Sequence, residues 1–157
     1  MIRVFYKPCG KSYKEQHAAA YELLYAAADI CGITYYGVEK TKDGKPYFVG
    51  SPDAFFSIAH GNSYAVVAIG DKECGVDIEG GREISQRISK RYLGGAQGKE
   101  ALILWTKKES FGKLDGKGFF AKKSNKKVVY KSFDLGDSVI TVCAYEGTEI
   151  SDKLESI

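Results

Sequence analysis

Residues 75–79 read Gly-Val-Asp-Ile-Glu, and the pattern of these five residues bears on both the fold and the candidate chemistry of the chain. Apolar Val76 and Ile78 alternate with acidic Asp77 and Glu79, which predicts a β-strand with two unlike faces. At about 3.3 Å per residue, the two carboxylates would lie roughly 6.6 Å apart on one face and repel each other unless a cation joins them. Taken alone, the stretch favours a solvated edge strand. A site for a hard cation such as Mg²⁺ depends on the rest of the chain.

Length and composition restrict the classes of protein. The 157 residues suit one domain, and the 44% hydrophobic and 27% charged residues indicate a soluble globular protein without an apolar run that could cross a membrane. The N-terminus lacks the features of a signal peptide, and the four cysteines lack zinc-ligand spacing, so we expect a cytoplasmic protein with reduced thiols. The net charge of +3 is too weak to indicate nucleic acid, but it suits an anionic substrate or an acidic partner.

Periodicity and turn residues predict segregated strands and helices. Strands are expected over residues 2–7, 33–39, 54–60, 64–69, 73–79, 128–133 and 138–145. Helices are expected over residues 14–31, 83–93 and 96–114. The short turns between residues 54 and 79 predict an antiparallel meander, and residues after Gly147 read as a polar, frayed tail. The order predicts an α+β fold with a mostly antiparallel sheet and packed helices.

The helix expected over residues 96–114 carries Lys108, Glu109 and Lys113. Glu109 and Lys113 are four residues apart and project from one side, which also fits an ordinary surface ion pair. Glu109 would complete a Mg²⁺ site with the two acids of the strand, and the lysines would hold phosphate oxygens beside it. Such a set predicts phosphate-transfer chemistry, which relies on positioning and charge neutralisation.

Four motifs, in this order, resemble those of the 4′-phosphopantetheinyl transferases, specifically the larger class that activates carrier proteins of peptide and polyketide synthesis. They are Gly-Lys-Pro at 44–46, Phe-Ser-Ile-Ala-His-Gly at 56–61, Gly-Val-Asp-Ile-Glu at 75–79 and Trp-Thr-Lys-Lys-Glu-Ser-Phe-Gly-Lys at 105–113. The resemblance covers about residues 14–145. It implies the fold of that family, here as two unequal pseudo-repeated subdomains with the site in the cleft between them.

The resemblance implies a Mg²⁺-dependent enzyme that moves the phosphopantetheine arm of coenzyme A to a serine of an apo acyl- or peptidyl-carrier protein and releases adenosine 3′,5′-bisphosphate. The implied site residues are Asp77, Glu79 and Glu109 for the metal and Lys45, Pro46, His60, Lys108 and Lys113 for coenzyme A. Glu109 and Lys113 would be catalytic, with Lys113 on the pyrophosphate and Lys108 in support. His60 and Lys45 would meet the 3′-phosphate or the adenosine end. The acceptor of the serine proton stays open between a metal-bound water and a nearby carboxylate.

Arg82 stands where the family commonly has a Lys and keeps the positive charge. The chain departs from the family pattern in three other ways. Ala59 stands where a Ser is frequent, Gln97 stands by count where a Glu has been proposed to assist proton transfer, and the first half is short. These departures support an alternative, a degenerate module that binds coenzyme A or a carrier protein without turnover. A metal-dependent nuclease is a third reading that the ordered motifs disfavour. We expect one domain with a shortened subdomain at about 1–60, a metal-binding subdomain at about 61–147 and a tail at 148–157, acting as a monomer.

Two further surfaces have both a functional and an ordinary interpretation. Phe111, Phe119 and Phe120 predict an apolar patch for a carrier-protein helix. Five nearby lysines would attract an acidic carrier protein or form a solvated turn: Lys117, Lys122, Lys123, Lys126 and Lys127. Three basic residues at the start of the first helix predict an anion site or a solvated turn: Lys11, Lys14 and His17.

Overall fold

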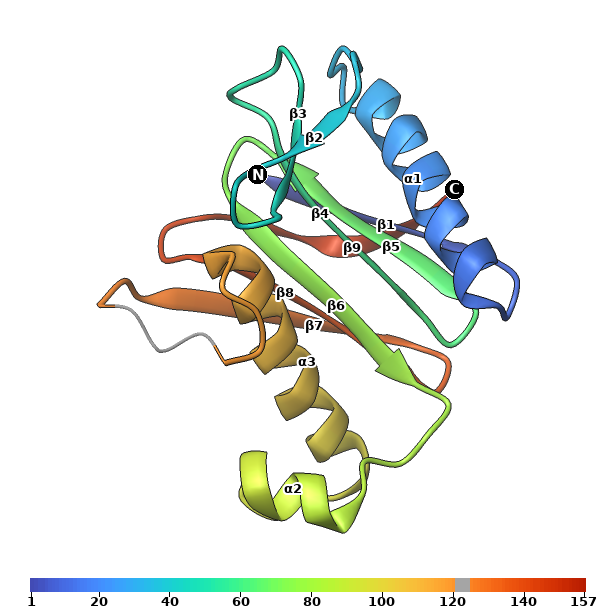
Figure 1. Cartoon of the computed structure of the whole chain (residues 1–157), viewed down its shortest axis with the longest axis vertical. Helices are drawn as coiled ribbons and strands as arrows, with labels where there is room; N and C mark the ends of the chain where they lie inside the picture. Colours follow the sequence, from blue (N-terminus) through green and yellow to red (C-terminus); the bar gives the residue numbers. More distant parts are fainter. Residues whose placement is uncertain (121–124) are drawn as a thin grey trace.

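A computed structural model describes residues 1–120 and 125–157 of the protein (Figure 1). The helices are α1 (Tyr13–Ile30), α2 (Gln86–Tyr92) and α3 (Gly98–Asp115). The strands are β1 (Ile2–Pro8), β2 (Val38–Lys40), β3 (Pro46–Phe48), β4 (Phe55–Gly61), β5 (Tyr64–Gly70), β6 (Cys74–Gly80), β7 (Val128–Leu135), β8 (Ser138–Tyr145) and β9 (Ile150–Ser156). Among the described residues, no helix has the length and apolar character that a membrane span requires.

The strands form two main sheets and a small hairpin. The first sheet has the order β4-β5-β1-β9, the second has the order β6-β8-β7, and β2 pairs with β3. Every pairing is antiparallel except that of β1 with β9. The predicted α+β class with mostly antiparallel sheets is therefore confirmed.

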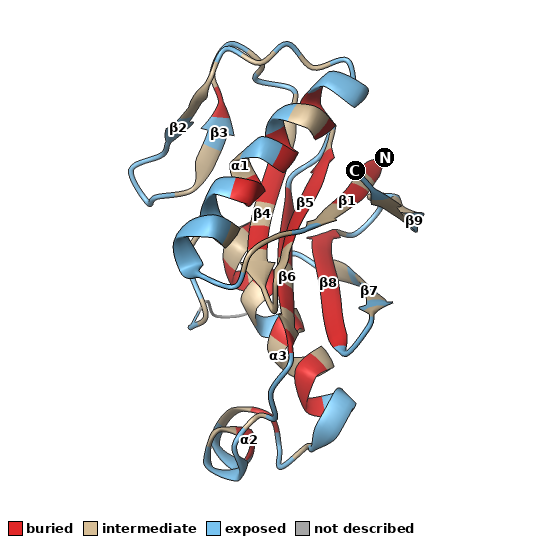
Figure 2. Ribbon diagram, turned by 90° about the vertical axis from the view of Figure 1, so that its right-hand side faces the viewer, coloured by how far each residue is buried: buried red, intermediate tan, exposed pale blue. Residues whose placement is uncertain are grey.

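The two sheets pack face to face, and a long helix covers the outer face of each. One core lies between α1 and the first sheet, and it includes Leu23, Leu24 and Phe5. A second core lies between the sheets, where Val76 and Ile78 of β6 meet residues of β1, β5 and β8. Figure 2 shows both as buried strands beneath the helices, with the short α2 standing apart from them. The predicted two-faced character of residues 75–79 is confirmed, because the apolar side of β6 faces the second core.

Helix α1 begins at a capping box, in which the Ser12 side chain accepts from the backbone of Glu15 and the Glu15 carboxylate accepts in return. Its buried face consists of alanines and leucines: Ala19, Ala20, Leu23, Leu24, Ala27 and Ala28. Tyr25 is apolar and its position along α1 would suit the buried face, yet its side chain is 61% exposed. The small alanines let the helix lie close to the sheet, so the tyrosine is not needed to fill the contact.

The predicted meander is wrong at its last strand. Asn62 and Ser63 both have positive φ, the geometry of a tight two-residue turn, so β4 and β5 form a hairpin. Strand β6 pairs with β8 rather than with β5, and the chain changes sheets at 71–73. A short connection such as residues 71–73 therefore does not require the two strands that it joins to pair with each other. The expected subdomain boundary near residue 60 lies within the β4–β5 hairpin of the first sheet.

The expected frayed tail is also wrong. Residues 150–156 form β9, which adds to the edge of the first sheet parallel to β1. Ile150 and Leu154 pack against the core between the sheets, and Glu155 accepts two hydrogen bonds from Arg3 at 2.9 and 2.6 Å. Two apolar side chains and one ion pair therefore hold residues 150–156 in a strand, although the polar composition of this segment predicts a frayed end.

Two other element boundaries differ from the prediction. Residues 33–37 are irregular, and only Val38–Lys40 of that region forms a strand, because its single partner is the three-residue β3. Helix α2 begins at Gln86 rather than at residue 83, since the Ser85 side chain caps it by accepting from the backbone N–H of Ile88.

Candidate functional site

Strand β6 turns its polar side towards α3. Gly75 lies under this helix, where an added Cβ would stand 1.9 Å from the Ser110 carbonyl oxygen. Asp77 and Glu79 follow on the same face and are partly buried. The glycine therefore admits α3 closely enough for its side chains to reach the two carboxylates.

Helix α3 brings Glu109 and Lys113 to these acids. Burial raises the pKa of Asp77 to about 6, with Lys113 opposing the rise and the charges of Glu109 and Glu79 adding to it. Burial and the charge of Glu79 also raise the pKa of Glu109. The three carboxylates predicted as metal ligands thus lie close enough to interact electrostatically, which sequence spacing alone could not establish.

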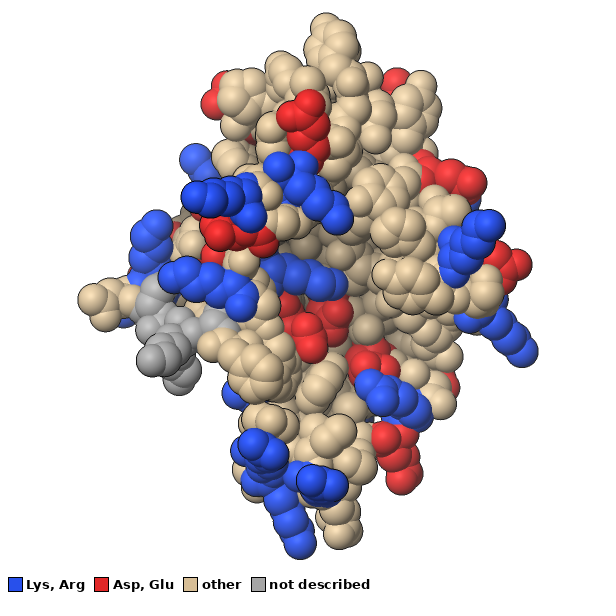
Figure 3. All heavy atoms as spheres, in the orientation of Figure 1, with Lys and Arg blue, Asp and Glu red and all other residues tan. Residues whose placement is uncertain are grey.

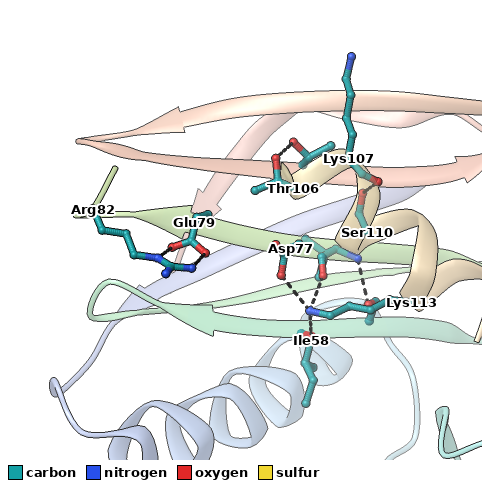
Figure 4. A network of polar contacts seen from close by, with 11 residues as sticks. Ile58, Asp77, Glu79, Arg82, Thr106, Lys107, Ser110 and Lys113 are labelled. Atoms are coloured by element: carbon teal, nitrogen blue, oxygen red, sulfur yellow. Dashed lines mark hydrogen bonds and ion pairs between the residues drawn. The ribbon is translucent and has the colours of Figure 1, made fainter. Parts of the chain in front are cut away.

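In this arrangement each strand carboxylate has a cationic partner. Glu79 accepts two hydrogen bonds of 3.0 Å from Arg82, and Asp77 accepts one of 3.2 Å from Lys113 (Figure 4). Over residues 1–120 and 125–157, no three histidine, cysteine or acidic side chains form a group ready to hold a metal ion. A bound cation would therefore share these carboxylates with Arg82 and Lys113 or replace them as partners.

A cavity of about 460 Å³ lies beside the carboxylates. Lys45, Pro46, His60 and Lys113, all predicted to bind coenzyme A, line it. The remaining lining residues include Lys40, Asp43, Ser57, Ala59 and Gly112. Because Asp43 is its one carboxylate among the described residues, against three lysines, the cavity suits an anionic ligand.

The side chains at one end of this cavity form a cluster of aromatic and imidazole rings. The ring of His60 lies 5.7 Å from that of His17 on α1 and 4.9 Å from that of Tyr13, measured between centroids. Burial, His17 and Lys113 lower the pKa of His60. Of the three basic residues expected near the start of α1, His17 lines the cavity, whereas Lys11 and Lys14 are not among its described lining residues.

Lys108 lies away from this cavity. Its ammonium group lies 5.9 Å from the ring centroid of Phe119, and it lines a separate groove of about 600 Å³ with Lys107 and Phe111. The predicted patch is only partly exposed, since Phe120 is 76% exposed while Phe111 and Phe119 are half-buried. Lys126 and Lys127 line the groove as well, and Lys122 and Lys123 lie outside the described residues.

The charges on this side of the molecule are mixed. Figure 3 shows acidic side chains at the hollowed centre of the face with Lys and Arg side chains around them. A polyanionic ligand can therefore meet cations, while a metal ion can meet carboxylates, within one region of the surface.

The two departures from the family motifs have different structural settings. Ala59 is buried and lines the cavity. Gln97 is exposed at the N-cap of α3, twelve residues before Glu109, which corresponds to about 18 Å along the helix. A glutamate at position 97 would thus lie far from the three carboxylates.

Sequence reasoning noted Arg82 only as a retained positive charge, and it missed the contributions of Ser57 and Lys40. Arg82 holds Glu79, Ser57 accepts a hydrogen bond from the backbone of Val76 at 3.0 Å, and Lys40 lines the cavity. The spacing of Arg82, three residues after Glu79, was a usable signal. Ser57 and Lys40 act across elements, and no local pattern indicates such contacts.

Comparison with known proteins gives one consistent name. No known family profile matches the chain. The 4′-phosphopantetheinyl transferase Sfp of Bacillus subtilis (strain 168) is 34% identical over 87 residues, which cover 48% of this chain and 39% of that protein. Another 4′-phosphopantetheinyl transferase of Bacillus subtilis is 33% identical over 102 residues, which cover 57% of this chain and 44% of that protein. The 4′-phosphopantetheinyl transferase psf-1 of Bacillus pumilus is 33% identical over 92 residues, covering 51% and 40%.

These matches confirm the resemblance to the 4′-phosphopantetheinyl transferase superfamily that the four motifs predicted. The matched part spans less than half the length of each of these relatives.

Proposed function

We propose that this chain is a 4′-phosphopantetheinyl transferase that moves the phosphopantetheine arm of coenzyme A to a serine of an apo carrier protein. The observation that supports it best is a cavity with three lysines, one of which, Lys113, also donates to Asp77 in the group of three interacting carboxylates. Phosphoryl transfer between anionic reactants needs this combination of positive charge and metal-binding oxygen atoms.

Coenzyme A would place its nucleotide end in the cavity. Lys45 and His60 would meet the 3′-phosphate or the adenosine, next to Pro46, and His17 and Lys40 add to the same walls. Lys113 would stand beside the pyrophosphate with its positive charge. Lys108, which lines the separate groove, would support the site from the other side of α3.

The acidic residues suit Mg²⁺ by their chemistry. Asp77, Glu79 and Glu109 offer only oxygen atoms. Burial and, to a smaller extent, the charges of neighbouring carboxylates raise the pKa of Asp77 and Glu109, and a bound cation would offset both effects. These three residues would hold the ion. When bound, it would neutralise charge on the pyrophosphate and help the leaving group depart.

The transfer itself balances as a displacement at phosphorus. The serine oxygen forms a bond to the phosphorus that carries the pantetheine arm, and the bond from that phosphorus to the oxygen bridging the two phosphates breaks. Adenosine 3′,5′-bisphosphate leaves with the bridging oxygen, and the serine proton is taken up within the site. The residues of this chain orient both reactants and exclude competing geometries.

The acidic carrier protein would dock over the groove beside α3. Lys107, Lys108 and Lys127 supply positive charge there, and Phe111 and Phe119 supply apolar surface. We expect a monomer, in which α1 with the first sheet and α3 with the second sheet are the reduced halves of an internal repeat.

Intact-protein mass spectrometry tests the function. Purified chain, Mg²⁺ and coenzyme A are mixed with a panel of apo acyl- and peptidyl-carrier proteins. A mass gain of one phosphopantetheine, absent when EDTA is added, is expected. Absence of any gain with coenzyme A binding intact by calorimetry would overturn the transfer proposal and support a binding module.

A substitution at Glu109 tests the role of the acids. Glu109→Gln keeps the size of the side chain and should reduce Mg²⁺-dependent transfer by about 100-fold, because a charged group at the reacting phosphates is lost. Glu100→Gln, an exposed position in the first turn of the same helix, is the matched control and should transfer at the normal rate. A normal rate in Glu109→Gln would show that the metal assignment is wrong.

A further inference from the structure

The two sheets meet along a line that we call the seam, where Ile58 of β4 lies beside Val76 of β6. Strand β4 is at the edge of the first sheet and β6 at the edge of the second, so each has backbone groups that its own sheet does not pair. Ser57 bridges the seam once, by accepting a hydrogen bond of 3.0 Å from the Val76 N–H.

Lys113 provides the other bridge. Its ammonium group donates to the carbonyl oxygen of Ile58 at 3.2 Å, to that of Val76 at 2.9 Å and to Oδ1 of Asp77 at 3.2 Å. Figure 4 shows the side chain reaching from α3 to Asp77 and Ile58. An ammonium group has three N–H donors, so all three meet protein acceptors.

These contacts connect the two parts of the proposed site. Ile58 and His60 line the anionic-ligand cavity, and Asp77 belongs to the carboxylates. Hydrogen bonds from a charged donor are about twice as strong as neutral ones, and the side chain of Asp77 is only 14% exposed. Lys113 therefore links the cavity wall to the strand of the carboxylates, beside the single hydrogen bond that Ser57 accepts from Val76.

We propose that Lys113 is a positioning residue that joins β4 to β6 and thereby sets the place of His60 relative to Asp77. A role of this geometry in catalysis rests on the proposed transferase function. The bridging itself does not, because the three contacts exist in the ligand-free protein.

Hydrogen exchange of the ligand-free protein tests the bridging, with Lys113→Met as the variant and Lys45→Met as the matched control. Lys45 lines the same cavity, but it donates to the Leu114 carbonyl oxygen rather than across the seam. Lys113→Met should speed exchange in peptides of β4 and β6 about tenfold. Peptides of β1 and β5 should be unchanged, and Lys45→Met should leave β4 and β6 as in the parent.

Parent-like exchange in β4 and β6 of a folded Lys113→Met protein would overturn the inference. If that variant does not fold, Lys113→Arg replaces it. The planar guanidinium keeps the charge but does not match three converging acceptors, so intermediate exchange is expected. Unchanged exchange in Lys113→Arg would then overturn the bridging.

A kinetic comparison separates positioning from direct phosphate contact. Lys113→Arg should keep coenzyme A affinity within about threefold and lower the transfer rate about tenfold or more, since small misplacement of reacting groups slows the chemical step. A loss of affinity without a fall in the maximal rate would contradict positioning. If the parent transfers nothing, the function proposal fails, and the exchange result still decides the role of Lys113.

Discussion

Helices α1 and α3 have the same length, 18 residues, and each covers the outer face of one sheet, yet they bury different chemistry. The buried face of α1 consists of alanine and leucine. Helix α3 also buries Thr106, Ser110 and Gly112, and it faces a strand that carries two acids. The region around α1 therefore packs mainly apolar side chains against its sheet, whereas the region around α3 also buries hydroxyl groups and faces two acids.

The ends of the two helices differ in the same way. Helix α1 begins with the capping box of Ser12 and Glu15, while Gln97 at the N-cap of α3 makes no side-chain capping bond. Strand β6 carries an acid whose pKa is raised to about 6, whereas Arg3 lowers the pKa of Glu155 on β9. The region around α1 thus has a capped helix and an acid stabilised by an ion pair, whereas the region around α3 has an uncapped helix start and an acid whose charged form is disfavoured by burial.

The largest expected effect is at the contact of α3 with β6. Gly75→Ala would place a methyl group 1.9 Å from the Ser110 carbonyl oxygen and 2.7 Å from the Leu114 nitrogen. Since both neighbours are backbone atoms, α3 must shift, and we expect a loss of about 4 kcal/mol in unfolding free energy together with loss of transfer. Urea unfolding and the carrier mass assay measure the two effects.

Gly61→Ala on β4 is the control, because its added Cβ would lie 3.4 Å from the nearest atom, an ordinary contact. Equal losses in both variants would mean that the close approach at Gly75 has no special role.

A core substitution in the first half should separate stability from function. Leu23 is fully buried beneath α1, and Leu23→Ala should cost about 3 kcal/mol through lost burial and the remaining cavity. The transfer rate per folded molecule should stay at the parent value, because Leu23 belongs to the core beneath α1 and is not among the described residues that line the cavity. A matching fall in the rate at temperatures where the variant is folded would show that the halves are not separable.

The raised pKa of Asp77 predicts a pH dependence. Between about pH 4 and pH 6 the folded protein binds more protons at Asp77 than the unfolded chain does, so stability falls as the pH rises through this window. The contribution is about 2 to 3 kcal/mol, and Asp77→Asn should lack it. Urea unfolding at pH 4 to 7, with and without the substitution, gives the difference.

Glu155 is the control of opposite sign. Its hydrogen bonds with Arg3 lower its pKa, so its stabilisation is complete above the usual glutamate range and is lost as the pH falls through the lower folded value. Glu155→Gln should therefore reduce stability by about 1 kcal/mol or less at pH 7 and by nothing at strongly acid pH. The same direction of pH dependence for both acids would contradict the contrast between the halves.

The smallest expected effects are at the helix ends. Ser12→Ala should cost about 1 kcal/mol, because the capping bonds to the first turn of α1 are lost. Gln97→Asp should gain a few tenths to about 1 kcal/mol by supplying the missing cap of α3. Thermal unfolding measures both, and a loss of stability in Gln97→Asp would show that the end of α3 does not accept a cap.

Local patterns predicted most of the elements correctly. The strand at residues 75–79, the hairpin at Gly136-Asp137 and the helix ending before Gly32 follow from alternation, turn residues and helix formers that act within a few residues. Counting along the chain assigned Gln97 to the position of the family's Glu, but it could not show that this residue lies about 18 Å along the helix from Glu109. The sequence did not predict that residues 150–156 form a strand, because the few apolar side chains of β9 are stabilised only when the segment pairs with β1.

Side-chain identity and short-range periodicity were enough to predict the α+β class and the two unlike faces of β6, and they supply the residue types on which the proposed phosphate chemistry rests. The packing of distant segments set the remaining features: β6 pairs with β8, and Lys113 bridges the seam. It also places Lys45, His60 and Lys113 around one cavity, with Lys108 in a separate groove. These features depend on contacts between residues far apart in the chain. Backbone groups of edge strands and buried charges must find partners, and the chain can satisfy them only after the two sheets have packed together.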